Sequence, residues 1–392
     1  MKKVLVPKVR FKGFEGEWKE ETIGNIANIT NGKSNTSDNN KWGQYNLYIR
    51  SEEIYKSNKY IFDVEGVITV GDGNIGKIFH YVNGKFDLHQ RCYLIYEFQN
   101  IWPKYFYYYF SQNFYKRAIL MSYTATVNSI RMNTITDMDI MFPKELIEQQ
   151  KIGKLLDQIS NLITLEQSKL NKLKKLKKTL LEKMFPEHNS KKPRIRFKGF
   201  EGEWKEYKFN DIGSYYSTSS LSYNDLSKGG QYKCVLYGEL YTKYNERIFN
   251  VISRTNKKIT LTQPNDILFP TSTTVDSYSL ISPSCVNEEN VMTGGDLFGI
   301  RPYKNINGNF ISYYINNVEY IKNKLANKAQ GLTIIHLYYK NILNENLYIA
   351  SLEEQNKIAK LFVKIDTIIN LYQSKLKKLK KIKEALLQKM FL

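Results

Sequence analysis

Apolar residues recur at every third or fourth position in two long stretches of the chain. The first stretch carries Ile152, Leu155, Ile159 and Leu162, and then Leu170, Leu173, Leu176, Leu180 and Met184. The second runs in the same way from Ile358 to Met390. Steps of three and four predict amphipathic helices that pair as a coiled coil, with a stutter near the middle of each. A helix of about 36 residues is about 54 Å long.

The rest of the chain has the shorter pattern of a β-rich protein. Strands are predicted at 64–70, 77–82 and 92–96, and later at 232–237, 258–261, 266–269 and 297–301. Asn83-Gly84 lies between two of these segments and predicts a hairpin turn. One helix is predicted in each half, at 103–121, where Pro103 suits a helix start, and at 309–328.

The chain is an internal duplication. Residues 10–20 recur letter for letter at 196–206, and residues 148–185 align without gaps on 354–391, with 23 of 38 positions identical. The segments between these repeats share no obvious identity, so the two copies are alike at their edges and different in their middles.

The predicted fold is therefore α+β, with two β-rich domains in tandem, each followed by a long helix. A chain that turns back on itself favours antiparallel neighbours, so the helices are expected to pair as an antiparallel coiled coil with pseudo-two-fold symmetry. The predicted boundaries are a first domain at 1–147, its helix at 148–185, a polar linker at 186–195, a second domain at 196–352 and its helix at 353–392.

The net charge of the chain limits the classes of partner that it is expected to bind. The 58 Lys and Arg against 38 Asp and Glu give a net charge of +20, which favours nucleic acid, an anionic membrane or an acidic protein. No apolar run approaches the roughly 18 residues of a membrane span, and the start of the chain does not resemble a signal peptide. Three cysteines outside any CxxC pattern and four histidines indicate a reducing cytoplasm and neither a metal site nor a cofactor.

Apparent catalytic motifs are weak. Gly71 to Gly76 spells G-x-G-x-x-G, but a strand-like segment follows where a dinucleotide site needs a helix, so a turn at a sheet edge is favoured. The same stretch and residues 27–34 each fall one residue short of a P-loop. The aromatic run at 105–110 fits a buried core helix better than a base-stacking surface. These features predict a protein that binds rather than catalyses.

Two different β-rich domains joined by a basic helical spacer are suited to recognising a DNA target that consists of two parts. The alternative is a tandem-domain structural adaptor whose basic coiled coil binds an acidic protein partner. A nucleic-acid enzyme that uses one of the incomplete P-loops is the least favoured class.

The repeats resemble type I restriction-modification specificity subunits. Pro143 leading to Glu148-Gln149 and Ile152, and the second copy at 353–358, are similar to the Pro-x-x-x-Glu-Gln-x-x-Ile signature of that family. The Arg-Phe-x-x-Phe-x-Gly-Glu-Trp box looks like the family's lead-in, and Gly71 to Lys77 resembles the turn of its target-recognition domains. The second copy departs from the signature, because Ala350-Ser351 replaces the proline.

The resemblance implies two target-recognition domains, no active site and a place in the cytoplasm. Double-stranded DNA, two methyltransferase (M) subunits and restriction/translocase (R) subunits would be the partners, and the M subunits would supply S-adenosylmethionine and adenine methylation. No motif marks the residues that contact DNA, so polar and cationic side chains on turns are the candidates. They are Lys33, Ser34, Arg50, Asn74, Lys77, Arg91 and Arg131 in the first half, and Lys228, Gln231, Lys233, Arg254, Thr273 and Tyr278 in the second.

Overall fold

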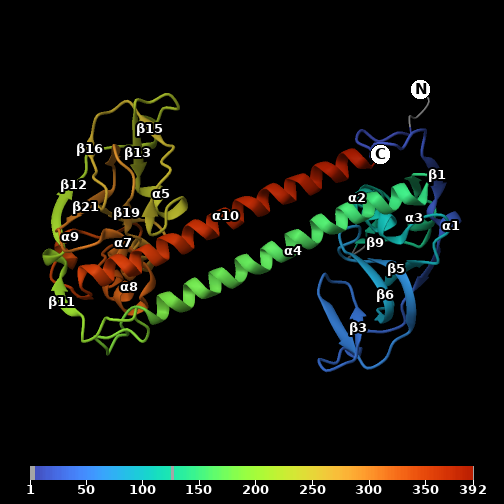
Figure 1. The fold of residues 1–392 in the computed structure, drawn as a ribbon, viewed down its shortest axis with the longest axis horizontal. Coiled ribbons are helices and arrows are strands. Elements are labelled where there is room, and N and C mark those ends of the chain that lie inside the picture. The colour runs from blue at the N-terminus through green and yellow to red at the C-terminus, as the bar shows by residue number, and fades with distance from the viewer. Residues whose placement is uncertain (1–4, 125–127, 392) are drawn as a thin grey trace. The chain divides into compact units, whose positions relative to one another are not determined.

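The computed structural model describes residues 5–124 and 128–391 and divides the chain into two compact units (Figure 1). Unit 1 is Met1–Ser168 with Gln373–Leu392, and unit 2 is Lys169–Tyr372. The two long helices α4 (Leu146–Lys183) and α10 (Leu352–Met390) therefore each contribute one part to unit 1 and the other part to unit 2.

Unit 1 is built on a six-stranded sheet with the order β2-β7-β5-β6-β3-β4. The strands are β2 (Asn28–Asn31), β3 (Tyr45–Tyr48), β4 (Ile54–Ser57), β5 (Phe62–Val70), β6 (Phe79–Leu88) and β7 (Cys92–Tyr96). Two small antiparallel pairs accompany it, β1 (Lys19–Thr22) with β10 (Asp139–Phe142) and β8 (Tyr123–Thr124) with β9 (Asn128–Ser129). Short helical turns lie at α1 (Ile23–Ile26), η1 (Thr36–Asp38) and α3 (Asn133–Thr136).

The prediction of a hairpin turn at Asn83-Gly84 is wrong. Strand β6 continues through both residues, with Gly84 opposite Val64 on β5. Val82, Phe86 and Leu88 alternate along the strand and are buried, so ending the strand at Gly84 would expose an apolar face. Gly84 has a φ of +98°, a backbone conformation that favours glycine, and its place inside a strand marks a bend rather than a turn.

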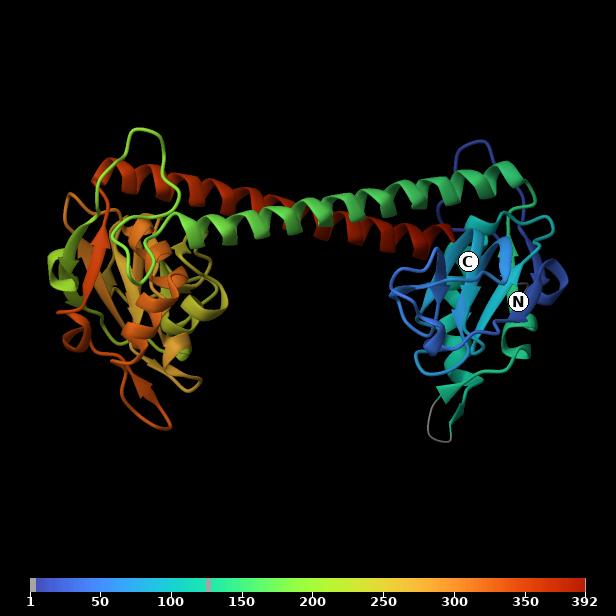
Figure 2. The same cartoon turned by 90° about the horizontal axis from the view of Figure 1, so that it is seen from below.

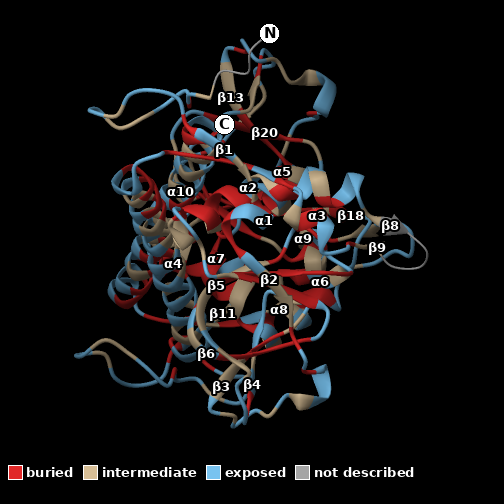
Figure 3. Cartoon of the chain, turned by 90° about the vertical axis from the view of Figure 1, so that its right-hand side faces the viewer, coloured by how far each residue is buried: buried red, intermediate tan, exposed pale blue. Residues whose placement is uncertain are grey.

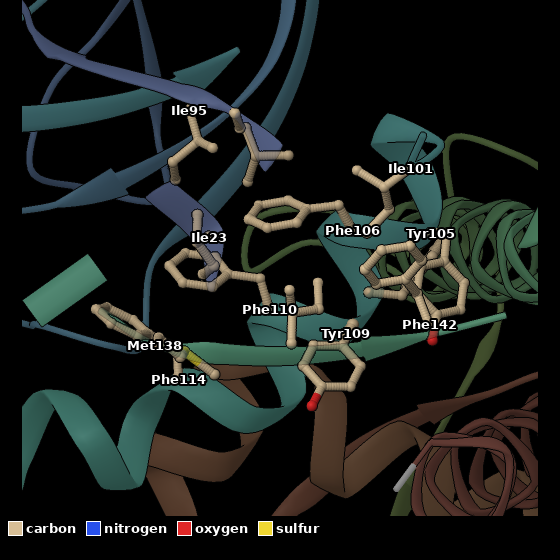
Figure 4. Close-up of a cluster of buried hydrophobic side chains, with 14 of the residues drawn as sticks. Ile23, Ile95, Ile101, Tyr105, Phe106, Tyr109, Phe110, Phe114, Met138 and Phe142 are labelled. Carbon is tan, nitrogen blue, oxygen red and sulfur yellow. The ribbon is translucent and has the colours of Figure 1, made fainter. Parts of the chain in front are cut away.

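The core of unit 1 is aromatic and centres on α2 (Pro103–Leu120), which packs against β5 and β6. Figure 4 shows Tyr105, Phe106, Tyr109, Phe110 and Phe114 pointing into one cluster with isoleucines from the sheet side. The prediction that the aromatic run forms a buried helix is confirmed, because Tyr105, Phe106 and Phe110 are fully buried. These rings are therefore not available for base stacking.

Unit 2 has two sheets where unit 1 has one large sheet. The five-stranded sheet runs β12 (Gly213–Ser217), β21 (Leu297–Pro302), β17 (Ile267–Pro270), β19 (Ser284–Val286) and β14 (Arg247–Ile248). The four-stranded sheet runs β15 (Arg254–Thr255), β13 (Tyr232–Leu236), β20 (Val291–Gly294) and β16 (Thr260–Leu261). Two-stranded pairs are formed by β11 (Lys205–Lys208) with β23 (Asn346–Ile349) and by β18 (Ser272–Thr273) with β22 (Ile335–His336).

The single helix predicted at 309–328 is two helices. Helix α7 (Gly308–Asn317) ends at Val318, which has extended backbone angles, and α8 (Glu319–Ala326) begins at once. Two asparagines precede the break and the β-branched Val318 occupies it, and all three residues are weak helix formers. The short helices of unit 2 are η2 (Phe209–Asp211), η3 (Tyr223–Asp225), α5 (Tyr237–Thr242), α6 (Ser277–Leu280) and α9 (Tyr339–Ile342).

The long helices run antiparallel within each unit. In unit 1, Glu166 of α4 pairs with Lys375 of α10, and Asp157 and Lys383 both contact Tyr108. In unit 2, Lys177 pairs with Asp366 at 2.7 Å. The predicted seam is partly wrong, because burial concentrates where the helices meet the domains. Ile152, Leu156, Leu170, Leu181 and Met184 of α4 are buried, whereas Leu162 and Leu176 are exposed. Figure 3 shows exposed residues along the outside of both helices.

Candidate nucleic-acid interface

A buried ion pair anchors each long helix to the repeated box that precedes its domain. In unit 1 the Arg10 guanidinium donates to both oxygens of Glu148, at 2.7 and 2.8 Å, and to the carbonyl of Gly16. In unit 2 Arg196 makes the same three bonds to Glu354 and Gly202. The bond to Glu148 raises the pKa of Arg10, so the guanidinium stays charged. Figure 2 shows each box lying beside the beginning of the helix that it holds.

The glutamine that follows each of these glutamates hydrogen-bonds to the loop before a helix inside the domain, α2 in unit 1 and α7 in unit 2. Gln149 accepts from the N–H of Trp102 and donates to the carbonyls of Asn100 and Pro143. Gln355 accepts from Asn307 and donates to Asn305 and Ala350. Each glutamine therefore satisfies backbone groups of two loops at once, while the glutamate before it holds the arginine of the box.

The Lys-Met-Phe at the end of each long helix completes a core. Phe391 lies in unit 1, with its ring 5.4 Å from that of Tyr105 and 5.7 Å from that of Tyr109. Phe185 lies in unit 2 against Trp204, Phe310 and Tyr314. The two units are thus held by the same anchors and differ in the sheets that those anchors support.

In unit 1, five of the seven candidate residues gather around the turn between β5 and β6. The N–H of Gly71 donates to the carbonyl of Arg91, and that of Ile130 donates to the carbonyl of Gly71, so Arg91 and Arg131 flank the turn. Arg50 reaches the same turn from the end of β3, and Asn74 is part of it. Lys77 is also part of the turn, where its N–H donates to the carbonyl of Asn74 and its ammonium lies 5.5 Å from the ring centre of Tyr115.

Asp72 lies at the centre of this group. Its carboxylate accepts from Arg50 Nη1 at 3.0 and 3.1 Å and from Arg91 Nη1 at 2.7 Å. The Asp72 side chain is 6% exposed, whereas those of Arg50 and Arg91 are 43% and 63% exposed. A hollow of about 380 Å³ opens beside it, lined by Thr36, Ile49, Arg50, Asp72, Gly73 and Asn74.

Two candidates of unit 1 lie outside the group. Ser34 is buried and its hydroxyl donates to Asp87 at 2.6 Å, so the side chain serves the interior and is not accessible to DNA. Lys33, the neighbour of Ser34, is exposed, and its N–H donates to the carbonyl of Leu88, the last residue of β6. His89 lies beneath the arginines, and burial together with the charge of Arg50 lowers the pKa of His89. Its Nδ1 accepts from the N–H of Arg91, so the ring stays neutral.

In unit 2 the candidates fall into two groups. The first lies at one end of β13, where Arg254 donates to the carbonyl of Gly230 and Lys233 pairs with Glu288. Lys228 and Gln231 are exposed on the adjoining turn. The second group is Thr273 and Tyr278, which line a separate hollow of about 830 Å³. Thr273 is buried within its wall, and Tyr278 is 41% exposed at its edge.

Further residues, which were not among the candidates, belong to the larger hollow of unit 2 and to the cluster around the β5–β6 turn of unit 1. Lys322 stands in the larger hollow, 4.5 Å from the ring centre of Tyr278, and burial lowers the pKa of Lys322. Tyr241 and His336 line the same hollow. Asp72 was visible in the glycine-rich turn of the sequence, but only the fold brings Arg50 and Arg91 to it.

No group of three His, Cys, Asp or Glu within 5–124 and 128–391 is placed to hold a metal ion. Burial raises the pKa of the Cys92 thiol to about 12 and that of Cys234 to about 11, so neither is a ready nucleophile. Across the same part of the chain, no helix combines the length and the apolar character needed to cross a membrane.

Comparison with known proteins agrees with this architecture. The family model described as the type I restriction modification DNA specificity domain matches residues 15–175 and again residues 201–381. The chain belongs to this family. It is a type I restriction-modification specificity subunit with two recognition domains.

Individual relatives match this chain over different shares of its length. The putative type I restriction enzyme MjaX specificity subunit of Methanocaldococcus jannaschii is 26% identical over 354 residues, which are 86% of this chain and 80% of that protein. The type I restriction enzyme EcoDI specificity subunit of Escherichia coli is 29% identical over 150 residues, 37% of this chain and 32% of that protein. The S subunit structure from M. genitalium shares the fold, with a TM-score of 0.71, 16% identity and 99% of both chains covered. None of these supports a structural adaptor.

Proposed function

We propose that the two recognition domains bind two different half-sites of one double-stranded DNA target. The observation that carries this proposal is the contrast between the two units. Identical anchors support a six-stranded sheet in one and paired five- and four-stranded sheets in the other. Different polar side chains on equivalent supports are what the reading of two unrelated sequences requires.

The candidate residues divide into two roles. Lys33, Lys77 and Lys228 are exposed cations that suit phosphate oxygens, where they would position the protein. The other candidates suit base edges in the major groove. Guanidinium forks are offered by Arg50, Arg91, Arg131 and Arg254, and amides by Asn74 and Gln231. Lys233 offers an ammonium, and the hollow of unit 2 offers the hydroxyls of Thr273 and Tyr278.

The chain carries out no chemistry of its own in this proposal. It scaffolds two methyltransferase subunits and the restriction/translocase subunits, which supply catalysis. The exposed, lysine-rich outer faces of α4 and α10 offer surfaces for them. A subunit that reads chromosomal DNA works where the DNA is, so we place it in the cytoplasm.

Binding to DNA at stepped salt tests the proposal. The affinity for a random duplex should fall steeply, because a protein that contacts 6–10 phosphates loses roughly 10³–10⁵ in affinity between 50 and 200 mM salt. Addition of the methyltransferase subunits should tighten binding and start methyl transfer, which the chain alone should not perform. An affinity that is independent of salt, or absent with and without the methyltransferase, would contradict it.

A further inference from the structure

The carboxylate of Asp72 holds two arginines that otherwise face solvent. Both are bound through Nη1 alone, at 3.0 and 3.1 Å for Arg50 and 2.7 Å for Arg91. A guanidinium has five N–H donors in a fixed plane, so these bonds leave the Nε and Nη2 side of each side chain unengaged by Asp72. The pair is thus restrained in orientation while its outer edges stay exposed.

The turn that carries Asp72 is itself fixed. A Cβ on Gly71 would lie 2.9 Å from the Tyr93 ring and 3.0 Å from the Arg91 carbonyl, so glycine permits the close approach of the two loops. The Asp72 backbone forms a bridge with Ser129, and the N–H of Gly73 donates to Asn128. Loops from three parts of the chain therefore converge on one buried carboxylate.

The charge of this cluster argues for a base rather than a phosphate as its ligand. A phosphate contact gains from net positive charge, and Asp72 cancels half of the charge of the two arginines. Recognition of a base edge gains instead from orientation, because a side chain fixed beforehand loses less conformational freedom on binding. Guanine offers O6 and N7 as paired acceptors to an arginine fork in the major groove.

We propose that Asp72 is a positioning residue that orients Arg50 and Arg91 to read guanine in the half-site bound by unit 1. Asn74, on the wall of the same hollow, lies next to the place where the base edge would enter. This inference rests on the proposed function, and it adds that this half-site contains at least one guanine that unit 1 contacts.

The test uses the chain in complex with its methyltransferase subunits and a duplex that carries the methylated target. Each guanine of the unit 1 half-site is replaced in turn by 7-deazaguanine, which lacks the N7 acceptor. For the wild-type chain, one replacement should weaken binding by about 10- to 150-fold, the range for the loss of one hydrogen bond from a charged donor. Asp72→Asn should largely abolish that difference and should not lower the dependence of affinity on salt.

Two further variants separate positioning from folding. Arg91→Lys keeps the charge and loses the fork, so it should also lose the 7-deazaguanine effect and keep the fold. Asp266→Asn is the control in unit 2, because Asp266 is also a buried carboxylate that holds an arginine, here Arg301 through Nε and Nη2. It should leave discrimination in the unit 1 half-site intact.

Several results would overturn the inference. One is a wild-type complex that tolerates 7-deazaguanine at every position of that half-site, or a half-site without guanine. Another is an Asp72→Asn variant that loses affinity equally on all duplexes with a lower salt dependence, which would assign the arginines to phosphate. A complex that binds no DNA at all would instead refute the proposed function.

Discussion

Replacement of Phe391 by alanine should destabilise unit 1 and leave unit 2 unchanged, although Phe391 is the last residue described in the chain. The side chain is 5% exposed and packs edge-on against Tyr105 and Tyr109. Removal of a buried phenylalanine costs about 3–5 kcal/mol, and each lost edge-to-face pair accounts for about 0.5–1.5 kcal/mol of it. The equivalent change in unit 2 is Phe185→Ala, at a side chain that is 1% exposed.

Hydrogen exchange measured by mass spectrometry separates the two units. A loss of about 3–5 kcal/mol corresponds to an increase in opening of roughly 100- to 1000-fold or more, since each 1.4 kcal/mol is tenfold. Phe391→Ala should raise exchange in α2 and leave α7 protected, and Phe185→Ala should do the reverse. Unchanged exchange of α2 in Phe391→Ala would refute the inference that the far end of the chain completes the core of unit 1.

Two other changes test the anchor and the DNA contact. Arg10→Ala leaves the fully buried Glu148 charge unpaired and should destabilise unit 1 by about 3–5 kcal/mol in urea unfolding. Addition of Glu148→Gln should recover part of that loss, whereas Arg194→Ala, at an exposed pair with Glu187, should change stability by less than about 0.5 kcal/mol. Lys77→Ala should weaken binding equally on all DNA sequences and lower the salt slope by roughly one; a loss confined to one sequence would place Lys77 at a base edge.

The sequence predicted the repeated segments and long helices better than the β-rich segments between the repeats. The repeats and the apolar periodicity led to the long helices, because both signals are local and strong. The hairpin turn predicted at Asn83-Gly84 does not form, because the burial of Val82, Phe86 and Leu88 outweighs the local turn preference. Asn317-Val318 broke a helix that the apolar pattern alone would have continued.

The candidate site was predictable only as a set of residue types. Arg50, Arg91 and Arg131 were chosen as cations on turns, and the fold does bring them to one turn. The partner that Arg50 and Arg91 share, Asp72, could not be foreseen, because the pairing depends on the register of three strands. Ser34 was chosen as a polar side chain on a turn, and nothing in the sequence indicated that its hydroxyl turns inward to Asp87.

The central claim is that each recognition domain reads its own half of the target. The most direct measurement is a survey of methylated sites in a host that expresses this chain with its methyltransferase, compared with a variant in which residues 21–140 come from a relative. That exchange keeps the bonds of Arg10 to Glu148 and Gly16, and the anchors of unit 2, in place. The account predicts that one half of the methylated sequence changes and the other half stays the same. A change in both halves, or a target with no division into two parts, would contradict it.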